Sequence, residues 1–187
     1  MKYNLSEVIE LMQTRRSIAP ENFSDRKIQR EQLEKLIQCA TFAPNHKNTQ
    51  PWKFHVYYEN GMNILQEKLP ELFPIDEIKK KERIQLRLKQ TSAVILVCLN
   101  ASGKVDEIEE IQAVGCAVQN MLLVAHASGF AGFWSTPKFI SSIEFRNIIN
   151  LNETEKCLGI IYFGYTKMNW PQSHRKPIEY VTEWHQE

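Results

Sequence analysis

The chain has 187 residues, a length that suits a single domain over 1–187 with a sizeable core. Its 23 basic and 22 acidic side chains leave a net charge of +1, which does not favour nucleic-acid binding. No apolar run approaches the ~20 residues that cross a bilayer, and residues 1–12 lack the apolar core of a signal peptide. We therefore expect no nucleic-acid partner and no membrane partner.

The cysteines indicate a reducing compartment. They lie far apart in apolar surroundings, and no C-x-x-C pair occurs. We expect buried free thiols in a cytoplasmic protein at all four positions, Cys39, Cys98, Cys116 and Cys157.

The first half of the chain begins with two predicted helices. Apolar residues at helical spacing predict a helix from Leu5, with Ser6 as its N-cap, that ends near Arg15 and Arg16. A second helix is predicted over 33–40, before Pro44. Three elements follow: a strand over 52–58, a short helix over 62–69 and a polar helix over 75–90. The charge run of the polar helix favours a solvated face over a binding patch.

The second half is more apolar. Residues Ala93–Asn100 form a continuous run of β-formers, which predicts a strand buried on both faces. A long helix is predicted over 108–125, and Gly129 ends it. Small residues on one side of this helix permit close packing. The remaining predicted elements are a strand over 130–134, a helix over 141–150, an apolar strand over 156–165 and a strand-like tail over 178–184. Mixed helices and strands of this kind place the fold in the α+β or α/β class.

The tail after Tyr165 is unusually apolar for a chain end. It carries Trp170, Ile178, Tyr180, Val181 and Trp184, which would expose a costly patch if left in water. We expect it to pack on this subunit or on another.

Several common functional motifs are absent. The sequence contains no G-x-G-x-x-G, no G-x-x-x-x-G-K-[ST], no H-E-x-x-H and no G-x-S-x-G. His46 and His55 do not have metal-ligand spacing on a helix, and His126 is isolated. We therefore expect neither a metal site nor a hydrolase-type nucleophile.

Four polar stretches are candidates for binding. The first is Arg15, Arg16 and Ser17, whose guanidinium forks and hydroxyl suit a phosphate, although basic residues at a helix C-terminus also complement its dipole. The second is the loop "APNHKNTQPW", whose amide, imidazole and ammonium groups suit the polar edge of a heterocycle. The others are "GFWSTP" over 132–137, which suits a flat ring or a helix N-cap, and "SHRKP" over 173–177, a second source of phosphate contacts.

In combination these stretches resemble the nitroreductase family, in particular its short bacterial members. The resemblance is carried by "RRSI", "ATFAPNHKNTQPWKFHVY", "GCAVQNMLLVAHASGFAGFWSTP" and "LGIIYFGY", and it spans about 5–181. It implies an α+β three-layer sandwich with a central, mostly antiparallel sheet flanked by helices. It also implies a homodimer, with the C-terminal segment packed on the partner and one FMN in each of two interface sites.

The resemblance also implies roles for individual residues. Arg15 and Ser17 match phosphate contacts, with Arg16 beside them, and Arg175 completes the phosphate site. The loop residues that reach the flavin from the partner subunit are matched by His46 and Gln50, with Lys47 and Asn48 as additional candidates. The segment along the isoalloxazine ring is matched by Trp134, Ser135 and Thr136. Many short relatives have Arg directly after the tryptophan, where this chain has Ser135, so the group that contacts flavin N5 stays open.

The implied activity is FMN-dependent oxidation of NAD(P)H coupled, in a ping-pong cycle, to reduction of nitroaromatics, quinones or similar electron-poor acceptors. No catalytic side chain is expected, because the flavin carries the chemistry. His46 and Lys47 are candidates for stabilising the negative charge of the reduced ring. Alternatives are another flavin oxidoreductase of the same fold, such as a dehydrogenase or reductive dehalogenase, a non-enzymatic flavin-binding or redox-sensing module, and an interaction protein that has lost FMN.

Overall fold

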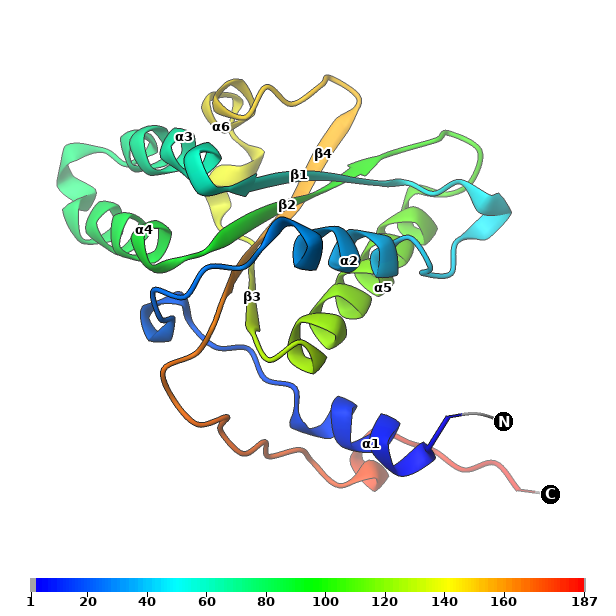
Figure 1. The fold of residues 1–187 in the computed structure, drawn as a ribbon. Coiled ribbons are helices and arrows are strands. Elements are labelled where there is room, and N and C mark those ends of the chain that lie inside the picture. Colours follow the sequence, from blue (N-terminus) through cyan, green and yellow to red (C-terminus); the bar gives the residue numbers. More distant parts are fainter. Residues whose placement is uncertain (1–2, 187) are drawn as a thin grey trace.

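The fold is built on one four-stranded sheet, seen in a computed structural model that describes residues 3–186 (Figure 1). The strands are β1 (Trp52–Tyr58), β2 (Ala93–Asn100), β3 (Ala131–Ser135) and β4 (Glu155–Gly164). Their order across the sheet is β1-β2-β4-β3, and every neighbouring pair is antiparallel. The α+β class with an antiparallel sheet is therefore confirmed.

Helices cover both faces of this sheet (Figure 1). The covering helices are α2 (Arg30–Ala40), α3 (Met62–Lys68), α4 (Ile78–Gln90), α5 (Glu107–Ala127) and α6 (Ile143–Ile148), whereas α1 (Leu5–Thr14) lies apart from the sheet, beside α5. One core lies between the sheet and helices α2 and α5, and a second lies between the sheet and helices α3, α4 and α6. This arrangement is the three-layer sandwich that the resemblance implies. None of the described helices has the combination of length and apolar content needed to cross a membrane.

Strand β2 shows why both faces are covered. Ile95 and Val97 belong to the core under α2 and α5, whereas Val94, Leu96 and Cys98 belong to the opposite core. Successive side chains of a strand point to opposite faces, so a continuous apolar run needs a helical layer on each side. The sequence prediction for this strand agrees with the structure at both ends.

Helix α1 differs from the other helices because none of its residues is buried. Its N-cap is Asn4, whose Oδ1 accepts a hydrogen bond from the Ser6 amide at 3.1 Å, so the assignment of Ser6 as the cap was wrong. Both side chains can cap a helix, and apolar periodicity alone does not separate positions two residues apart. Leu5 and Met12 remain 71% and 57% exposed, so this helix presents an apolar surface to solvent.

The C-terminal tail lies beside α1 (Figure 1). The strand predicted over 178–184 is wrong, because only a single 3₁₀ turn, Ile178–Tyr180, forms there and no strand partner is present. Tyr180, Val181 and Trp184 are each more than 70% exposed. β-Forming residues adopt strand geometry only where they meet a sheet edge, and within this chain the tail lies beside α1 and pairs with neither edge strand.

The cysteines are free, but they are not uniformly buried. Cys98 is buried, Cys39 and Cys157 are partly buried, and Cys116 is exposed. The prediction of burial at all four positions was therefore wrong for three of them. Cys116 lies on the outer side of α5, which shows that the small residues of this helix are shared between the core and the surface.

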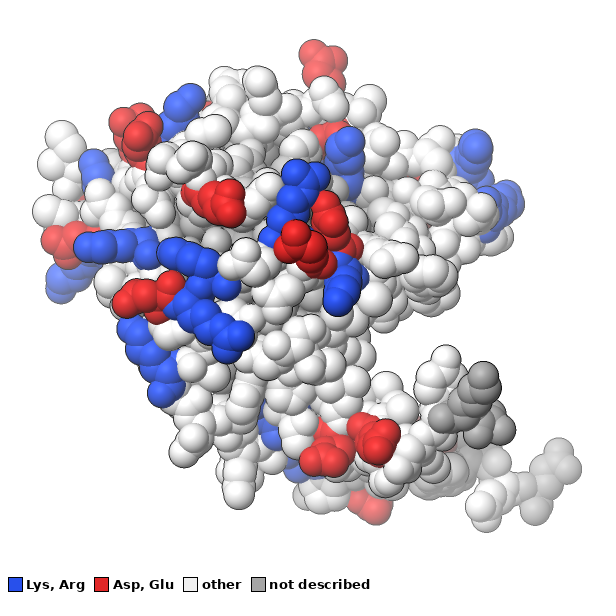
Figure 2. Space-filling model, viewed as in Figure 1, with Lys and Arg blue, Asp and Glu red and all other residues white. Residues whose placement is uncertain are grey.

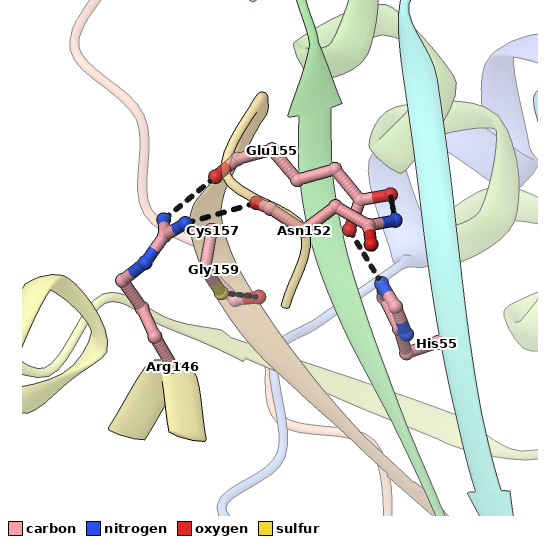
Figure 3. Close-up of polar contacts among 6 residues, drawn as sticks. All are labelled: His55, Arg146, Asn152, Glu155, Cys157 and Gly159. Carbon is pink, nitrogen blue, oxygen red and sulfur yellow. Dashed lines mark hydrogen bonds and ion pairs between the residues drawn. The ribbon is translucent and has the colours of Figure 1, made fainter. Parts of the chain in front are cut away.

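A buried carboxylate network joins β1 to the start of β4 (Figure 3). Glu155 is 3% exposed and accepts hydrogen bonds from Asn152 Nδ2 and His55 Nε2, both at 3.1 Å. Arg146 supports the same turn by donating to the backbone oxygens of Glu155 and Asn152, at 2.8 and 2.9 Å. Burial acts to raise the pKa of Glu155, but these hydrogen bonds and the attraction of His55 and Lys53 outweigh it and lower the pKa overall.

We expect Glu155→Gln to lower the free energy of unfolding by about 1.5–3 kcal/mol at neutral pH, the range for hydrogen bonds to a charged group. Because the folded-state pKa of Glu155 is depressed, its contribution is present above the ordinary pKa of 4.5 and is lost as pH falls through the folded value. The difference between wild type and variant, measured by urea denaturation, should therefore shrink below that pH. Glu107→Gln, which breaks only the exposed pair with Lys156, is the control and should cost less than about 1 kcal/mol.

Candidate functional site

Arg15 and Arg16 follow directly after α1, and Ser17 forms an isolated parallel bridge with Gly132 of β3. Arg15 is the C-cap of the helix and donates its amide to the Leu11 oxygen at 3.3 Å. The side chain of Arg16 folds back onto the backbone oxygens of Gln13 and Arg15. The first polar stretch therefore lies between the end of a helix and the edge strand of the sheet.

The arginines of the first and last polar stretches come together. Burial, followed by the positive charges of Arg16 and Arg175, lowers the pKa of Arg15, so the three guanidinium groups lie within electrostatic range of one another. Arg15 Nη1 and Arg16 Nε are buried without a hydrogen-bond partner. Among the described residues none of the three forms an ion pair with a carboxylate. Three neighbouring cations, two of which have unsatisfied donors, form a candidate anion site, and the donor set is one that suits a phosphate.

His126 belongs to the same cluster, although it was not predicted as a site residue. Its Nε2 is 2.9 Å from Thr14 Oγ1, and its ring packs edge-on against Trp170 with the centroids 4.4 Å apart. Burial lowers the pKa of His126, and the charges of Arg15 and Arg16 lower it further. Its position near the C-terminal end of α5 was visible in the sequence, but nothing there indicated that α1 would pack beside it.

Strand β3 leads from the arginine cluster to the predicted ring-binding segment. Gly132, at the bridge to Ser17, has no room for a side chain, because a Cβ would lie 2.4 Å from Leu122 Cδ2. From there the strand passes through Trp134, which is 40% exposed, to Ser135 and the exposed Thr136. About 10 Å of extended chain separates Gly132 from Ser135. Ser17 and the segment 134–136 are thus placed along one sheet edge.

The loop 45–50 has an unusual backbone. Lys47, Asn48 and Gln50 have φ values of 51°, 52° and 47°, in the left-handed region that side-chain-bearing residues rarely adopt. The Asn45 side chain supports the turn by accepting the Gln50 amide at 2.9 Å. Such conformations cluster at binding sites, where the surrounding structure holds them in place. The loop is therefore shaped to present its side chains.

Two loop side chains contact the region around the start of α5. His46 Nδ1 lies 2.6 Å from Glu109 Oε2, and Lys47 Nζ donates to the Lys104 oxygen at 3.4 Å. Gln50 Nε2 donates to Asn48 Oδ1 at 3.3 Å, and all four side chains are exposed. His46 thus has an acidic partner, whereas Lys47 contacts only a backbone oxygen and is the loop cation that no acidic side chain compensates within the described chain.

The structure does not bring the loop and the arginine cluster together within one chain. The loop contacts Glu109, whereas Arg15 and Arg16 lie within electrostatic range of His126, seventeen positions later on the same helix α5. At 1.5 Å per residue these ends of the helix are about 25 Å apart. The predicted site residues therefore form two groups: Arg15, Arg16, Ser17, Trp134, Ser135, Thr136 and Arg175 near one end, and His46, Lys47, Asn48 and Gln50 near the other.

The chain is similar to several curated proteins along most of its length. It is 28% identical over 152 residues to a protein of Escherichia coli K12 provisionally named NAD(P)H nitroreductase YdjA, an alignment that covers 79% of this chain and 82% of that protein. It is also 28% identical over 166 residues to a protein of Archaeoglobus fulgidus provisionally named NADH dehydrogenase/NAD(P)H nitroreductase, covering 87% of each chain.

Solved structures share the fold. A nitroreductase-like family protein from Bacillus cereus superposes with a TM-score of 0.89 at 25% identity, over 100% of this chain and 99% of that one. A provisionally assigned nitroreductase from Desulfovibrio desulfuricans, solved in complex with FMN, superposes with a TM-score of 0.78 at 23% identity, over 99% of both chains, which supports the fold alone. The family model described as the nitroreductase family matches residues 12–165. This chain therefore belongs to the nitroreductase family.

Proposed function

We propose that this protein is an FMN-dependent oxidoreductase that uses NAD(P)H to reduce nitroaromatic, quinone or similar electron-poor acceptors. Family membership supports a flavin oxidoreductase, and the Desulfovibrio desulfuricans relative was solved with FMN. The observation that carries the proposal is the arginine cluster, in which Arg15 Nη1 is buried without a partner beside two further cations. The free thiols of the described chain suit the cytoplasmic location that we also propose.

In this proposal the residues of the chain bind and orient the cofactor. Arg15, Arg16, Ser17 and Arg175 hold the phosphate through charge-assisted hydrogen bonds. Trp134, Ser135 and Thr136 lie along the ring. When bound, FMN supplies two-electron transfer from NAD(P)H to the acceptor, so no acid, base or nucleophile of the protein is needed. The fixed positive charge of Lys47 near the ring would favour the reduced cofactor electrostatically.

We propose a homodimer because one chain separates the two groups of site residues by about 25 Å. A partner related by a two-fold axis can place its loop 45–50 against the arginine cluster of the first chain, so that each site is shared. The exposed apolar side chains of α1 and the tail, among them Met12, Tyr180 and Trp184, provide surface for such an interface.

The tail also has a candidate place on the partner. Strand β1 is an edge of the sheet, paired only with β2 among the described strands. Beside it, α2 and β1 enclose a largely apolar cavity of about 460 Å³, lined in part by Leu33, Ile37 and Val56. We propose that the C-terminal segment of the partner packs here, which would cover both the cavity and the open edge.

The test is to purify the protein, measure its flavin content and follow anaerobic NAD(P)H oxidation with and without an acceptor. We expect bound FMN, reduction of the flavin by NAD(P)H, and faster NAD(P)H consumption when a nitroaromatic or a quinone is present. Flavin that is reduced but does not pass electrons to either acceptor would indicate a different oxidoreductase of this fold. Flavin that NAD(P)H does not reduce would indicate a binding or sensing module, and a colourless protein that does not take up FMN would contradict the proposal entirely.

A further inference from the structure

A groove lies between α4 and the segment that follows β3. The part beside Ser135 and Tyr162, called the inner part, has a volume of about 140 Å³, and the part beside Leu72 and Lys138, called the outer part, has about 480 Å³. Both parts are lined by Phe73, Lys80, Pro137 and Phe139. Ser135 lines the inner part. Because Ser135 belongs to the segment predicted to run along the isoalloxazine ring, and Pro137 directly follows that segment, this groove opens next to the proposed flavin site.

The walls of the groove suit a flat ring. Phe73 and Phe139 meet edge to face, with ring centroids 5.7 Å apart. Pro137 and Ile84 add apolar surface, and Leu72 extends it in the outer part. Aromatic and apolar walls with a few polar groups are typical of small-molecule sites.

The inner end of the groove is cationic. Arg83, Arg87 and Lys80 line it, and no acidic side chain does. Helix α4 contributes to this charge, since it carries six basic residues and one acidic residue, and Figure 2 shows Lys and Arg gathered over this part of the molecule. The basic side chains of α4 are thus divided between its exposed outer side and the side that lines the groove.

The two arginines are incompletely neutralised. Arg87 Nε donates to Glu21 Oε1 at 2.9 Å, and Arg83 Nε lies 3.6 Å from the same oxygen. The Glu21 carboxylate is thus the acidic partner of both Arg83 and Arg87. Within the described chain the terminal nitrogens of the two guanidinium groups form no hydrogen bond. Lys80 is paired with Glu77 at 2.5 Å, but the lysine is exposed and such surface pairs contribute little. An additional anion would complete the charge balance at this end.

We propose that this groove is the electron-acceptor site and that it prefers flat aromatic acceptors carrying an anionic group, such as a carboxylate, which Arg83 and Arg87 bind. The inference rests on the proposed function and specifies its substrate class. The inner volume admits one anionic group rather than a dinucleotide. For a nitrobenzoate, one NAD(P)H and one proton convert the nitro group to a nitroso group, with release of NAD(P)⁺ and water, so electrons and atoms balance.

The experiment compares 4-nitrobenzoate with 4-nitrobenzamide, which has the same shape but no charge. The readout is the ratio of kcat/KM for the carboxylate to kcat/KM for the amide. We expect the ratio to exceed one in the wild type and to fall about tenfold in Arg83→Gln, the loss of about one charge-assisted hydrogen bond. Lys79→Gln, the same charge change at an exposed position of α4 outside the groove, should leave the ratio unchanged. An unchanged ratio in Arg83→Gln would overturn the proposal.

Equilibrium binding separates this proposal from the proposed function. Calorimetric titration of the oxidised protein with 4-nitrobenzoate should show affinity about tenfold weaker in Arg83→Gln. If neither compound is turned over but binding still depends on Arg83, the anion site stands and the assigned reaction fails. A third arm compares KM for NADPH and NADH. If Arg83→Gln raises only the NADPH value and leaves the acceptor ratio unchanged, the basic end recognises the phosphate of the donor, and the acceptor proposal is wrong.

Discussion

Replacing Arg15 with alanine is expected to weaken FMN binding by about 1.5–3 kcal/mol, or roughly 10- to 150-fold. The reason is that Arg15 Nη1 is buried without a partner and lies within range of two further cations. The FMN phosphate would accept a hydrogen bond from that donor and neutralise the cluster. Removal of the Arg15 side chain should therefore raise the dissociation constant of FMN directly. Titration of the apoprotein with FMN, followed by quenching of flavin fluorescence, measures this change.

The same substitution should have little cost for the apoprotein. Arg15, Arg16 and Arg175 repel one another in the absence of an anion, so deleting one charge relieves strain. We expect the unfolding temperature of apo Arg15→Ala to equal or exceed that of the wild-type apoprotein. Arg15→Lys, which keeps the charge but loses the planar fork, should fall between the two in FMN affinity. Lys79→Ala, which removes one positive charge from an exposed position of α4, is the control for general charge effects.

A variant that unfolds at a lower temperature without FMN would give Arg15 a structural role. Unchanged FMN affinity in a well-folded Arg15→Ala protein would exclude it from the phosphate site. In either case the three-arginine cluster would need another explanation, such as an anionic partner that is not a flavin.

The local parts of the fold were predictable because they depend on short-range pattern. The continuous apolar run of β2 requires cover on both faces, and the structure supplies it. The tail was mispredicted because strand formation depends on an available edge, a property of the whole assembly rather than of the segment. Asn4 and Ser6 were confused for a related reason, since either side chain can cap the helix and only the backbone geometry decides between them.

The candidate site was predictable in composition but not in arrangement. Arg15 and Arg175 lie far apart in the chain, and although both stretches suited a phosphate, only the resemblance to a family placed them in one site. Nothing in the sequence indicated that His126 would join them, because that depends on how α1 packs beside α5. The groove under α4 was missed because a helix with many charges gives no periodic indication of which basic residues turn toward a cavity.

The separation of the two groups of site residues leads to the second large expected effect, which is the recovery of FMN binding when two defective variants form a mixed dimer. One variant carries Arg15→Ala. The other carries Asn48→Gly and Gln50→Gly, which remove two loop side chains while glycine still accepts the left-handed backbone at these positions. We expect each variant alone to bind FMN weakly. Co-expression with two different affinity tags allows the mixed dimer to be isolated.

If each site combines the arginines of one chain with the loop of the other, the mixed dimer has one site with every defect and one site with none. Its FMN content should then rise to about half of the wild-type value, since a two-fold dimer has two equivalent sites. If each site were built within a single chain, both sites of the mixed dimer would keep one defect, and its FMN content would stay as low as that of the parents. The two arrangements therefore predict different numbers of FMN molecules bound per mixed dimer. Partial loss of stability in either variant can only lower the FMN content, so it cannot imitate the recovery. Recovery to half would show that each site takes its arginines from one chain and its loop 45–50 from the other, as the separation of about 25 Å between His126 and Glu109 requires. The left-handed loop would then bind FMN in the site of the partner rather than in that of its own subunit.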